Sequence, residues 1–266
     1  MNAPKKCDFC GRSAPEVRLT REHVLAQSLR EAFVDSREHS YERAWLEQGE
    51  LRSASSARPL NLLDVVSRRL CQPCNNGWMS ELEAAAKPIL LRLITGERSL
   101  TTKDARTVRR WLAKTAVVCH FAEPNSDDPA AVDPADRALI MRGGVPPRWR
   151  FLLGTLDSPW RNHLHRSAVR APKQRTIGGR LITEIYHFSD IELGCFIGCV
   201  IGCPPHSDVG DRVTKHLADG MRKIYPFFAD ITNGGARLDR IGRLPDERAL
   251  NEIAVVFAEG LSQLGS

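Results

Sequence analysis

The segment RLCQPCNNGWMSELE, residues 69–83, decides the fold of the first third of the chain. It carries the second of two Cys-x-x-Cys pairs, Cys71 and Cys74, whereas the first pair, Cys7 and Cys10, lies in the segment CDFC near the N-terminus. Two such pairs can supply the four thiolates of a tetrahedral zinc ion. The pairs therefore predict a structural zinc site, which contributes on the order of 10 kcal/mol to folding.

The composition is that of a globular protein. The chain has 266 residues, 42% hydrophobic and 26% charged, with a net charge of +6, so it can form one large domain or two modest ones. Eight cysteines are too few for a disulfide scaffold, and the N-terminal segment MNAPKKCDFCGRS lacks the apolar core of a signal peptide. The longest apolar run, residues 193–202, is about half the ~20 residues of a membrane helix. We expect a cytoplasmic protein with reduced thiols and no membrane partner.

Between the two cysteine pairs, the segment LTREHVLAQ carries Glu22 and His23. Histidine is poised to take a proton from water near neutral pH, and a carboxylate can hold a divalent cation. Neighbouring side chains of a strand point to opposite faces, so both residues can serve one site only if the backbone bends there. Asn75, directly after Cys74, is expected either to cap a helix or to bind a metal.

Periodicity predicts an α+β fold. Strands are expected at residues 16–20 and within 60–71, and a helix at about 75–94 that Pro88 divides or kinks. A second helix is expected to follow, with Thr101 or Thr102 as its N-cap. Arg109, Arg110 and Lys114 lie elsewhere on this helix than its apolar face. That face is formed by Val108, Trp111, Leu112, Thr115 and Cys119.

The remaining segments divide the chain in two. Residues 28–60 are polar and are expected to form an insertion, with helix near Tyr41 to Leu51. Residues 1–97 then form one module and residues 98–266 an α+β accessory domain with an antiparallel sheet. Its expected strands lie at 150–156, 164–170, 181–188 and 193–202, and its short helices near 211–221 and 246–262. Three cysteines recur every four residues in the last strand and are expected to be small buried residues: Cys195, Cys199 and Cys203.

The order C-x-x-C, EH, N, C-x-x-C-N resembles the HNH nucleases, whose core is a ββα-metal motif. The resemblance covers residues 5 to about 90 and is carried above all by the four cysteines with Glu22-His23. It implies that His23 is the general base that activates water and that Glu22 and Asn75 bind a catalytic divalent metal, Mg²⁺ or another. It further implies that Asn61 orients the histidine and that the four cysteines hold structural Zn²⁺. Glu in place of the commoner Asp, and Asn in place of the final His, depart from the pattern.

The expected partner is DNA, most simply double-stranded, held through its phosphates. From Ser158 to Thr183 the chain has six Arg or Lys and no Asp or Glu. Such a run either contacts phosphate or is a solvated basic surface. The candidate nucleic-acid-binding residues are Arg161, Arg166, Arg170, Lys173 and Arg175.

Two other functions are compatible with the sequence. One is a catalytically inactive zinc-binding module that recognises nucleic acid or protein. The other is a redox or zinc sensor, in which the cysteines bind metal reversibly. Incubation with supercoiled plasmid and a divalent metal distinguishes the nuclease from the inactive module, and zinc retention under mild oxidant distinguishes a permanent zinc site from a sensor.

Overall fold

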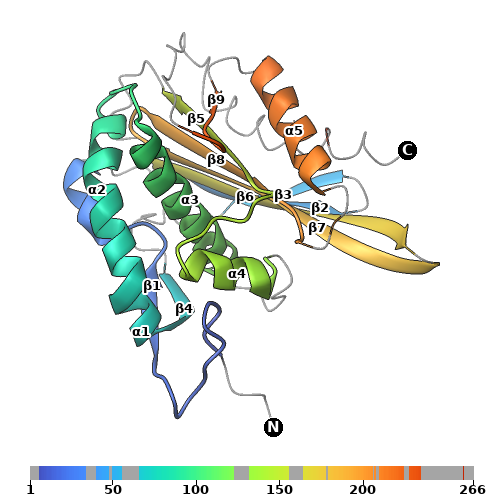
Figure 1. The fold of residues 1–266 in the computed structure, drawn as a ribbon, viewed down its shortest axis with the longest axis horizontal. Helices are drawn as coiled ribbons and strands as arrows, with labels where there is room; N and C mark the ends of the chain where they lie inside the picture. The colour runs from blue at the N-terminus through green and yellow to red at the C-terminus, as the bar shows by residue number, and fades with distance from the viewer. Residues whose placement is uncertain are drawn as a thin grey trace.

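The computed structural model describes residues 6–33, 40–47, 50–55, 66–122, 132–155, 164–177, 179–205, 207, 210–224, 228–234 and 260. These residues form an α+β fold, in which helices pack on two β-sheets whose strands are mostly antiparallel (Figure 1). The expectation of a mixed α+β fold with an antiparallel sheet is confirmed at this level. Within the described residues, no helix is both long and apolar enough to cross a membrane.

The elements follow one another along the chain in a fixed order. The strands are β1 (Leu19–His23), β2 (Ser40–Glu47), β3 (Glu50–Ser55), β4 (Val66–Cys71), β5 (Arg150–Thr155), β6 (Leu164–Ile177), β7 (Arg180–Leu193), β8 (Phe196–Gly202) and β9 (Ala229–Asp230). The helices are η1 (Gln27–Phe33), α1 (Gln72–Cys74), η3 (Asn75–Met79), α2 (Ser80–Ile94), α3 (Thr102–Ala122), α4 (Pro134–Met141) and α5 (Gly210–Ile224).

The first sheet consists of β1 and β4, which pair antiparallel and are followed by helix. Leu19 lies opposite Cys71 and His23 opposite Val66, and the register shifts between Thr20 and Glu22. Over that interval β4 has one residue more than β1, so the irregularity is a bulge in β4. The same register places Leu19, at the start of β1, beside Cys71 and the beginning of the helix that follows it.

The helix expected at 75–94 has three parts. A first turn at α1 leads into the wider π-helical turn of η3, where Gly77 leaves helical geometry, and then into α2. Pro88 lies inside α2, which continues past it to Ile94. The buried face of α2 is made by Leu82, Ala86, Ile89, Leu90, Leu93 and Ile94.

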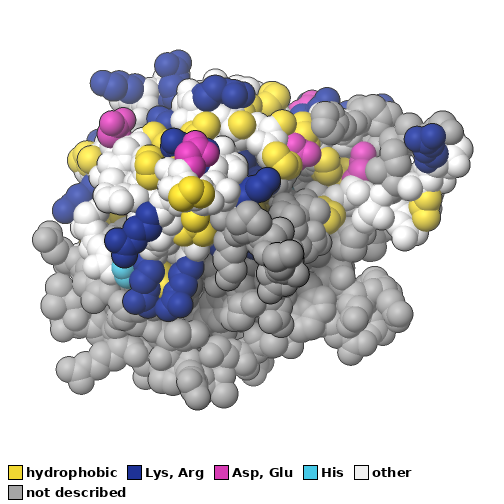
Figure 2. Space-filling model, turned by 90° about the horizontal axis from the view of Figure 1, so that it is seen from below, with side chains coloured by type: hydrophobic (Ala, Val, Ile, Leu, Met, Phe, Trp, Pro, Cys, Tyr) yellow, Lys and Arg dark blue, Asp and Glu magenta, His cyan; other side chains and the backbone are white. Residues whose placement is uncertain are grey.

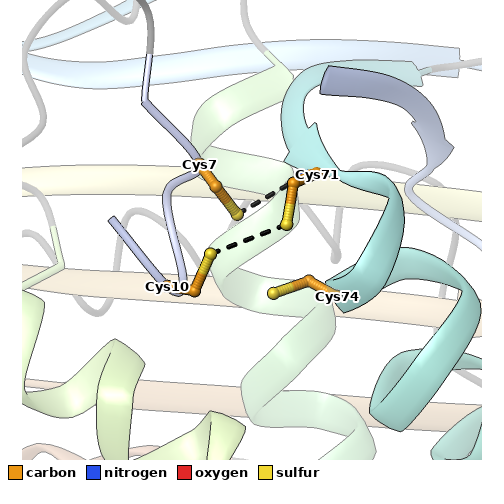
Figure 3. A group of neighbouring side chains, drawn as sticks. All are labelled: Cys7, Cys10, Cys71 and Cys74. Atoms are coloured by element: carbon orange, nitrogen blue, oxygen red, sulfur yellow. Dashed lines mark hydrogen bonds between the residues drawn. The ribbon is translucent and has the colours of Figure 1, made fainter. Parts of the chain in front are cut away.

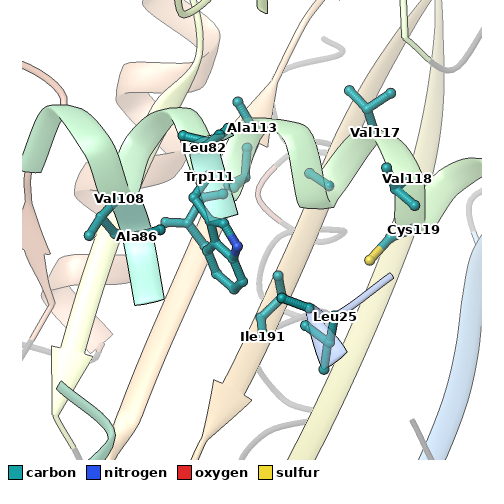
Figure 4. Packing of buried hydrophobic residues seen from close by; sticks show 14 of the residues in the cluster. Leu25, Leu82, Ala86, Val108, Trp111, Ala113, Val117, Val118, Cys119 and Ile191 are labelled. Carbon is teal, nitrogen blue, oxygen red and sulfur yellow. The ribbon is translucent and has the colours of Figure 1, made fainter. Parts of the chain in front are cut away.

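Helix α3 is the central element of the core. Its start is capped reciprocally: Asp104 N donates to Thr101 Oγ1 at 3.1 Å, and Thr101 N donates to Asp104 Oδ2 at 3.3 Å. The expected cap at Thr101 is therefore present. Figure 4 shows α3 lying across the strands, with side chains from α2, α3 and β7 packed together around Trp111. Val108, Trp111, Leu112 and Cys119 are all fully buried, as the periodicity predicts.

The second sheet has seven strands in the order β3-β2-β6-β7-β8-β5-β9. The expectation of a helix near Tyr41 to Leu51 is wrong, because these residues lie in β2 and β3, an antiparallel pair with Trp45 opposite Arg52. β2 in turn pairs parallel with β6, where Ser40 lies opposite His165. β3 is thus a near neighbour of β2 in the sequence, whereas β6, the other partner of β2, lies more than a hundred positions away.

Both faces of this sheet are covered where β8 runs through it. All seven residues of β8 are buried, with α2 and α3 on one side of the sheet and α5 on the other (Figure 1). Cys195, Cys199 and Cys203 are all buried, as expected for small core residues. The helix predicted at 246–262 lies outside the described residues except for position 260.

Candidate metal centre and adjoining pocket

The four paired cysteines come together at the C-terminal end of β4. Their Sγ atoms all lie within 4.8 Å of one another, and Cys10 Sγ lies 3.6 Å from Cys71 Sγ (Figure 3). Cys71 ends β4 and Cys74 lies in α1, while the turn after Cys10 needs Gly11, whose φ is +73°. No described cysteine forms a disulfide.

This donor set fits a zinc ion. Zn–S bonds of about 2.3 Å in a tetrahedron separate the sulfurs by about 3.8 Å, close to the separation seen here. The backbone N–H of Cys71 donates to Cys7 Sγ at 3.3 Å, a contact that stabilises a thiolate. The pKa of Cys7 is lowered to about 4, chiefly by the hydrogen bond from Cys74 and further by backbone N–H groups. A thiolate is the form that binds metal.

Two arginines hold Asp8, the residue that follows Cys7. Arg69 Nε lies 2.9 Å from Asp8 Oδ2, and Arg137 also contacts Asp8, which is buried between the two guanidinium groups. Both arginines stack on the ring of Phe121 at 4.9 and 5.4 Å. Arg137 lies in α4 and Phe121 in α3, so the second region supports the cysteine cluster directly.

A pocket of about 330 Å³ opens between β1, η1 and α2. Glu22 and His23 both line it, and His23 is the last residue of β1, where the regular alternation of side chains along the strand ends. The opposite wall comes from α2. Its lining residues are Ser80, Glu83, Ala84 and Lys87.

The ring of His23 is half-buried and held by a neighbour that the sequence did not single out. Gln27 Nε2 lies 2.8 Å from His23 Nε2 and 3.1 Å from His23 Nδ1, so the amide donates to a ring nitrogen. The segment after β1 turns at once into η1, which brings Gln27 back over the imidazole. The one indication of this contact in the sequence is the spacing of four positions between His23 and Gln27, which fits one helical turn.

Glu22 is buried, and its carboxylate is paired with an ammonium group. Lys114 Nζ lies 3.1 Å from Glu22 Oε1 and 2.6 Å from Glu83 Oε1. Burial raises the pKa of Glu22, an effect that Lys114 opposes. Burial alone lowers the pKa of Lys114, but Glu83 and Glu22 outweigh it and raise the pKa. The expectation that Lys114 lies away from the buried face of its helix is wrong, since its side chain is 0% exposed.

Asn75 lies at the start of the helix and contacts β1. Its amide nitrogen donates to Thr20 Oγ1 at 3.2 Å and to the carbonyl of Arg21 at 3.3 Å. Asn75 is not among the residues that line the pocket of Glu22 and His23. Within the described part of the chain, the four cysteines are the one group of three or more His, Cys, Asp or Glu side chains gathered closely enough for a metal ion.

The surface around this centre is strongly basic. In residues 6–23 and 66–74, the exposed carboxylate is Glu16, whereas five cationic side chains are exposed: Lys6, Arg12, Arg18, Arg21 and Arg68. Figure 2 views the molecule from the end where β1, β4 and α1 lie in Figure 1; Lys and Arg side chains outnumber Asp and Glu on the described part of that face. The sequence alone pointed to the later basic run, residues 158–183, and not to this surface.

Other candidate residues lie farther along the chain or beyond the description. Asn61 and Arg161 are outside the described residues. The other members of the basic run belong to β6 and pair with β7; these are Arg166, Arg170, Lys173 and Arg175, opposite Ile191, His187, Glu184 and Ile182.

Comparison with known proteins gives no match: no family model, no curated protein and no solved structure is similar to this chain.

Proposed function

We propose that this chain is a metal-dependent endonuclease of the HNH type that hydrolyses DNA phosphodiester bonds. The observation that carries the proposal is the pocket in which Glu22 and His23 lie together, beside a helix that follows two antiparallel strands and a four-cysteine cluster. This is the order of elements that the resemblance to HNH nucleases implies.

In this proposal, zinc serves as a structural ion and His23 performs the chemistry. Zinc held by the cysteines joins the N-terminal turn to the end of β4, which holds β1 and the helix in place. His23 takes a proton from water so that the oxygen can attack phosphorus, and the Gln27 amide orients the ring. A divalent ion held through Glu22, and in the resemblance through Asn75, would stabilise the charge that develops on the phosphate.

The basic face supports a nucleic-acid partner. Arg18, Arg21 and Arg68 are exposed and form no ion pair with a described residue, so their charges are available to phosphates. Arg21 lies beside Asn75, and the next two residues of β1 line the pocket. Phosphate contacts of this kind make affinity fall steeply as salt rises.

The direct experiment is cleavage of supercoiled plasmid by the zinc-loaded chain with Mg²⁺, Mn²⁺ or Ni²⁺. We expect nicked and linear products that disappear with chelator and in His23→Ala, while His216→Ala, an exposed histidine on α5, retains cleavage. His23→Ala should keep its zinc, its melting temperature and its affinity for a duplex. Nicking by His23→Ala at the wild-type rate would remove His23 from the mechanism.

A second candidate is a zinc-binding nucleic-acid module without catalytic activity. The ion pair between Glu22 and Lys114 favours it, because a carboxylate already paired with an ammonium attracts a further cation less strongly. This candidate predicts duplex binding without cleavage under every metal condition in the plasmid assay.

A further inference from the structure

A fully buried ammonium group lies behind the pocket of Glu22 and His23. Lys114 is in the middle of α3, and its Nζ contacts carboxylates from two other elements, Glu22 of β1 and Glu83 of α2. Lys114 Nζ donates a hydrogen bond of 2.6 Å to Glu83 Oε1. A lysine with 0% exposure is stable in the charged form only when such partners surround it.

The charges of this group do not cancel. One ammonium faces two carboxylates, and both carboxylates line the same pocket as His23. Lys114 therefore links β1 to α2, and the three ion-paired groups together carry one net negative charge. The other ionisable side chains that line this pocket are His23 and Lys87, and the Lys87 ammonium offsets that charge. A group that served packing alone would not need to be charged, because apolar side chains of similar volume are often as stabilising in a buried position.

We propose that Lys114 is a positioning residue of the catalytic pocket: it holds the carboxylates of Glu22 and Glu83 in place beside His23. The inference rests on the proposed nuclease function. It assigns a role to the region after residue 97, since α3 then supplies a group without which the pocket of β1 and α2 is incomplete. Catalysis depends steeply on such placement, and a shift of about 1 Å can cost about a hundredfold in rate.

The test uses full-length variants. Lys114→Met alone leaves the buried carboxylate of Glu22 and the half-buried carboxylate of Glu83 without their ammonium partner, so we expect a large loss of melting temperature. The double variant K114M/E83L removes one charge of each sign and leaves Glu22 unpaired, so it is expected to regain part of that melting temperature and to keep its zinc. Compared with Glu83→Leu, in which the pair between Lys114 and Glu22 persists, K114M/E83L should lose about tenfold or more in kcat with little change in KM.

Two further variants complete the design. Lys114→Arg, which keeps the charge, should recover much of the kcat that an apolar residue loses. Lys103→Met changes an exposed lysine at the start of the same helix and should match the wild type. Equal kcat for K114M/E83L and Glu83→Leu, at equal melting temperature, would overturn the proposal and leave Lys114 with a purely structural role.

A structural measurement that does not depend on activity tests this inference separately from the proposed function. Crystal structures of Glu83→Leu and K114M/E83L should show the Glu22 carboxylate displaced from its position beside His23 in the second variant alone. A wild-type chain that cleaves no nucleic acid would end the nuclease proposal and leave this structural comparison intact. An unmoved Glu22 in K114M/E83L would overturn the positioning role itself.

Discussion

The side-chain amide of Asn75 donates a hydrogen bond to Thr20 Oγ1 at 3.2 Å, across 55 positions of sequence. A second bond from the same amide reaches the carbonyl of Arg21. The register of the β1–β4 pair shifts between Thr20 and Glu22, so the amide holds β1 at this irregularity. Asn75 therefore ties the start of the helix to β1 just before Glu22 and His23, a structural task whether or not it also binds a metal.

Asn75→Ala should loosen the attachment of β1 to the start of the helix. Two hydrogen bonds of about 1 kcal/mol each are lost, so we expect a destabilisation of about 1–2 kcal/mol in chemical denaturation. Plasmid cleavage should fall as well, because β1 carries Glu22 and His23. Asn76→Ala, an exposed neighbour, is the control. Identical stability of the two variants would mean that these hydrogen bonds contribute nothing.

Cys71→Ser should release zinc and unfold the first region. A structural zinc site contributes on the order of 10 kcal/mol, so loss of one ligand is expected to lower the melting temperature sharply and to reduce the zinc content measured by elemental analysis. The control is Cys195→Ser, which alters a buried cysteine outside the cluster and should keep its zinc. A Cys71→Ser protein with full zinc and an unchanged melt would refute the structural role.

The double variant R21A/R68A should weaken duplex binding and its salt dependence. Each phosphate contact contributes about one unit to the slope of log affinity against log salt, so the slope should become shallower by about two. Fluorescence anisotropy with a labelled duplex measures this in the His23→Ala background, which prevents cleavage. The matched control K103A/R142A removes two exposed charges elsewhere and should leave the slope unchanged.

The same assay tests the basic run predicted from the sequence. The double variant K173A/R175A alters two positions of β6. If these side chains contact phosphate, the slope falls as it does for R21A/R68A; an unchanged slope assigns them to a solvated surface. A full effect here together with none for R21A/R68A would move the proposed DNA face from β1 and β4 to β6.

Tyr186 should ionise late and link stability to alkaline pH. The phenol is buried and bonded to Glu184 and Ser207, and burial raises its pKa to about 12. Its unfolded value is about 10, so this contribution to stability is complete below pH ~10 and is lost as the pH rises towards about 12. Ultraviolet titration should show one late phenolate that is missing in Tyr186→Phe. A phenolate that titrates near pH ~10 in the folded protein would contradict this.

Local pattern was sufficient for elements whose apolar positions follow a regular period. Helix α3, with Thr101 as its cap, and strand β5 lie where periodicity and capping put them. The sequence predicts helix where β2 and β3 form, and these strands pair with each other. Their place in the seven-stranded sheet depends on the pairing of β2 with β6, more than a hundred positions away, which no local window contains.

The candidate site divides in the same way. The spacing of Cys7, Cys10, Cys71 and Cys74 indicated a metal centre from the sequence alone, because two cysteines separated by two residues reach one ion from a single turn. Tertiary structure alone decided the position of Lys114: helical periodicity can identify an apolar face, but only the packing of α3 against β1 and α2 brings two carboxylates to a buried ammonium. A charged side chain is tolerated in a core only where the tertiary structure supplies a partner of opposite charge, and the spacing of residues along the sequence does not predict that partner.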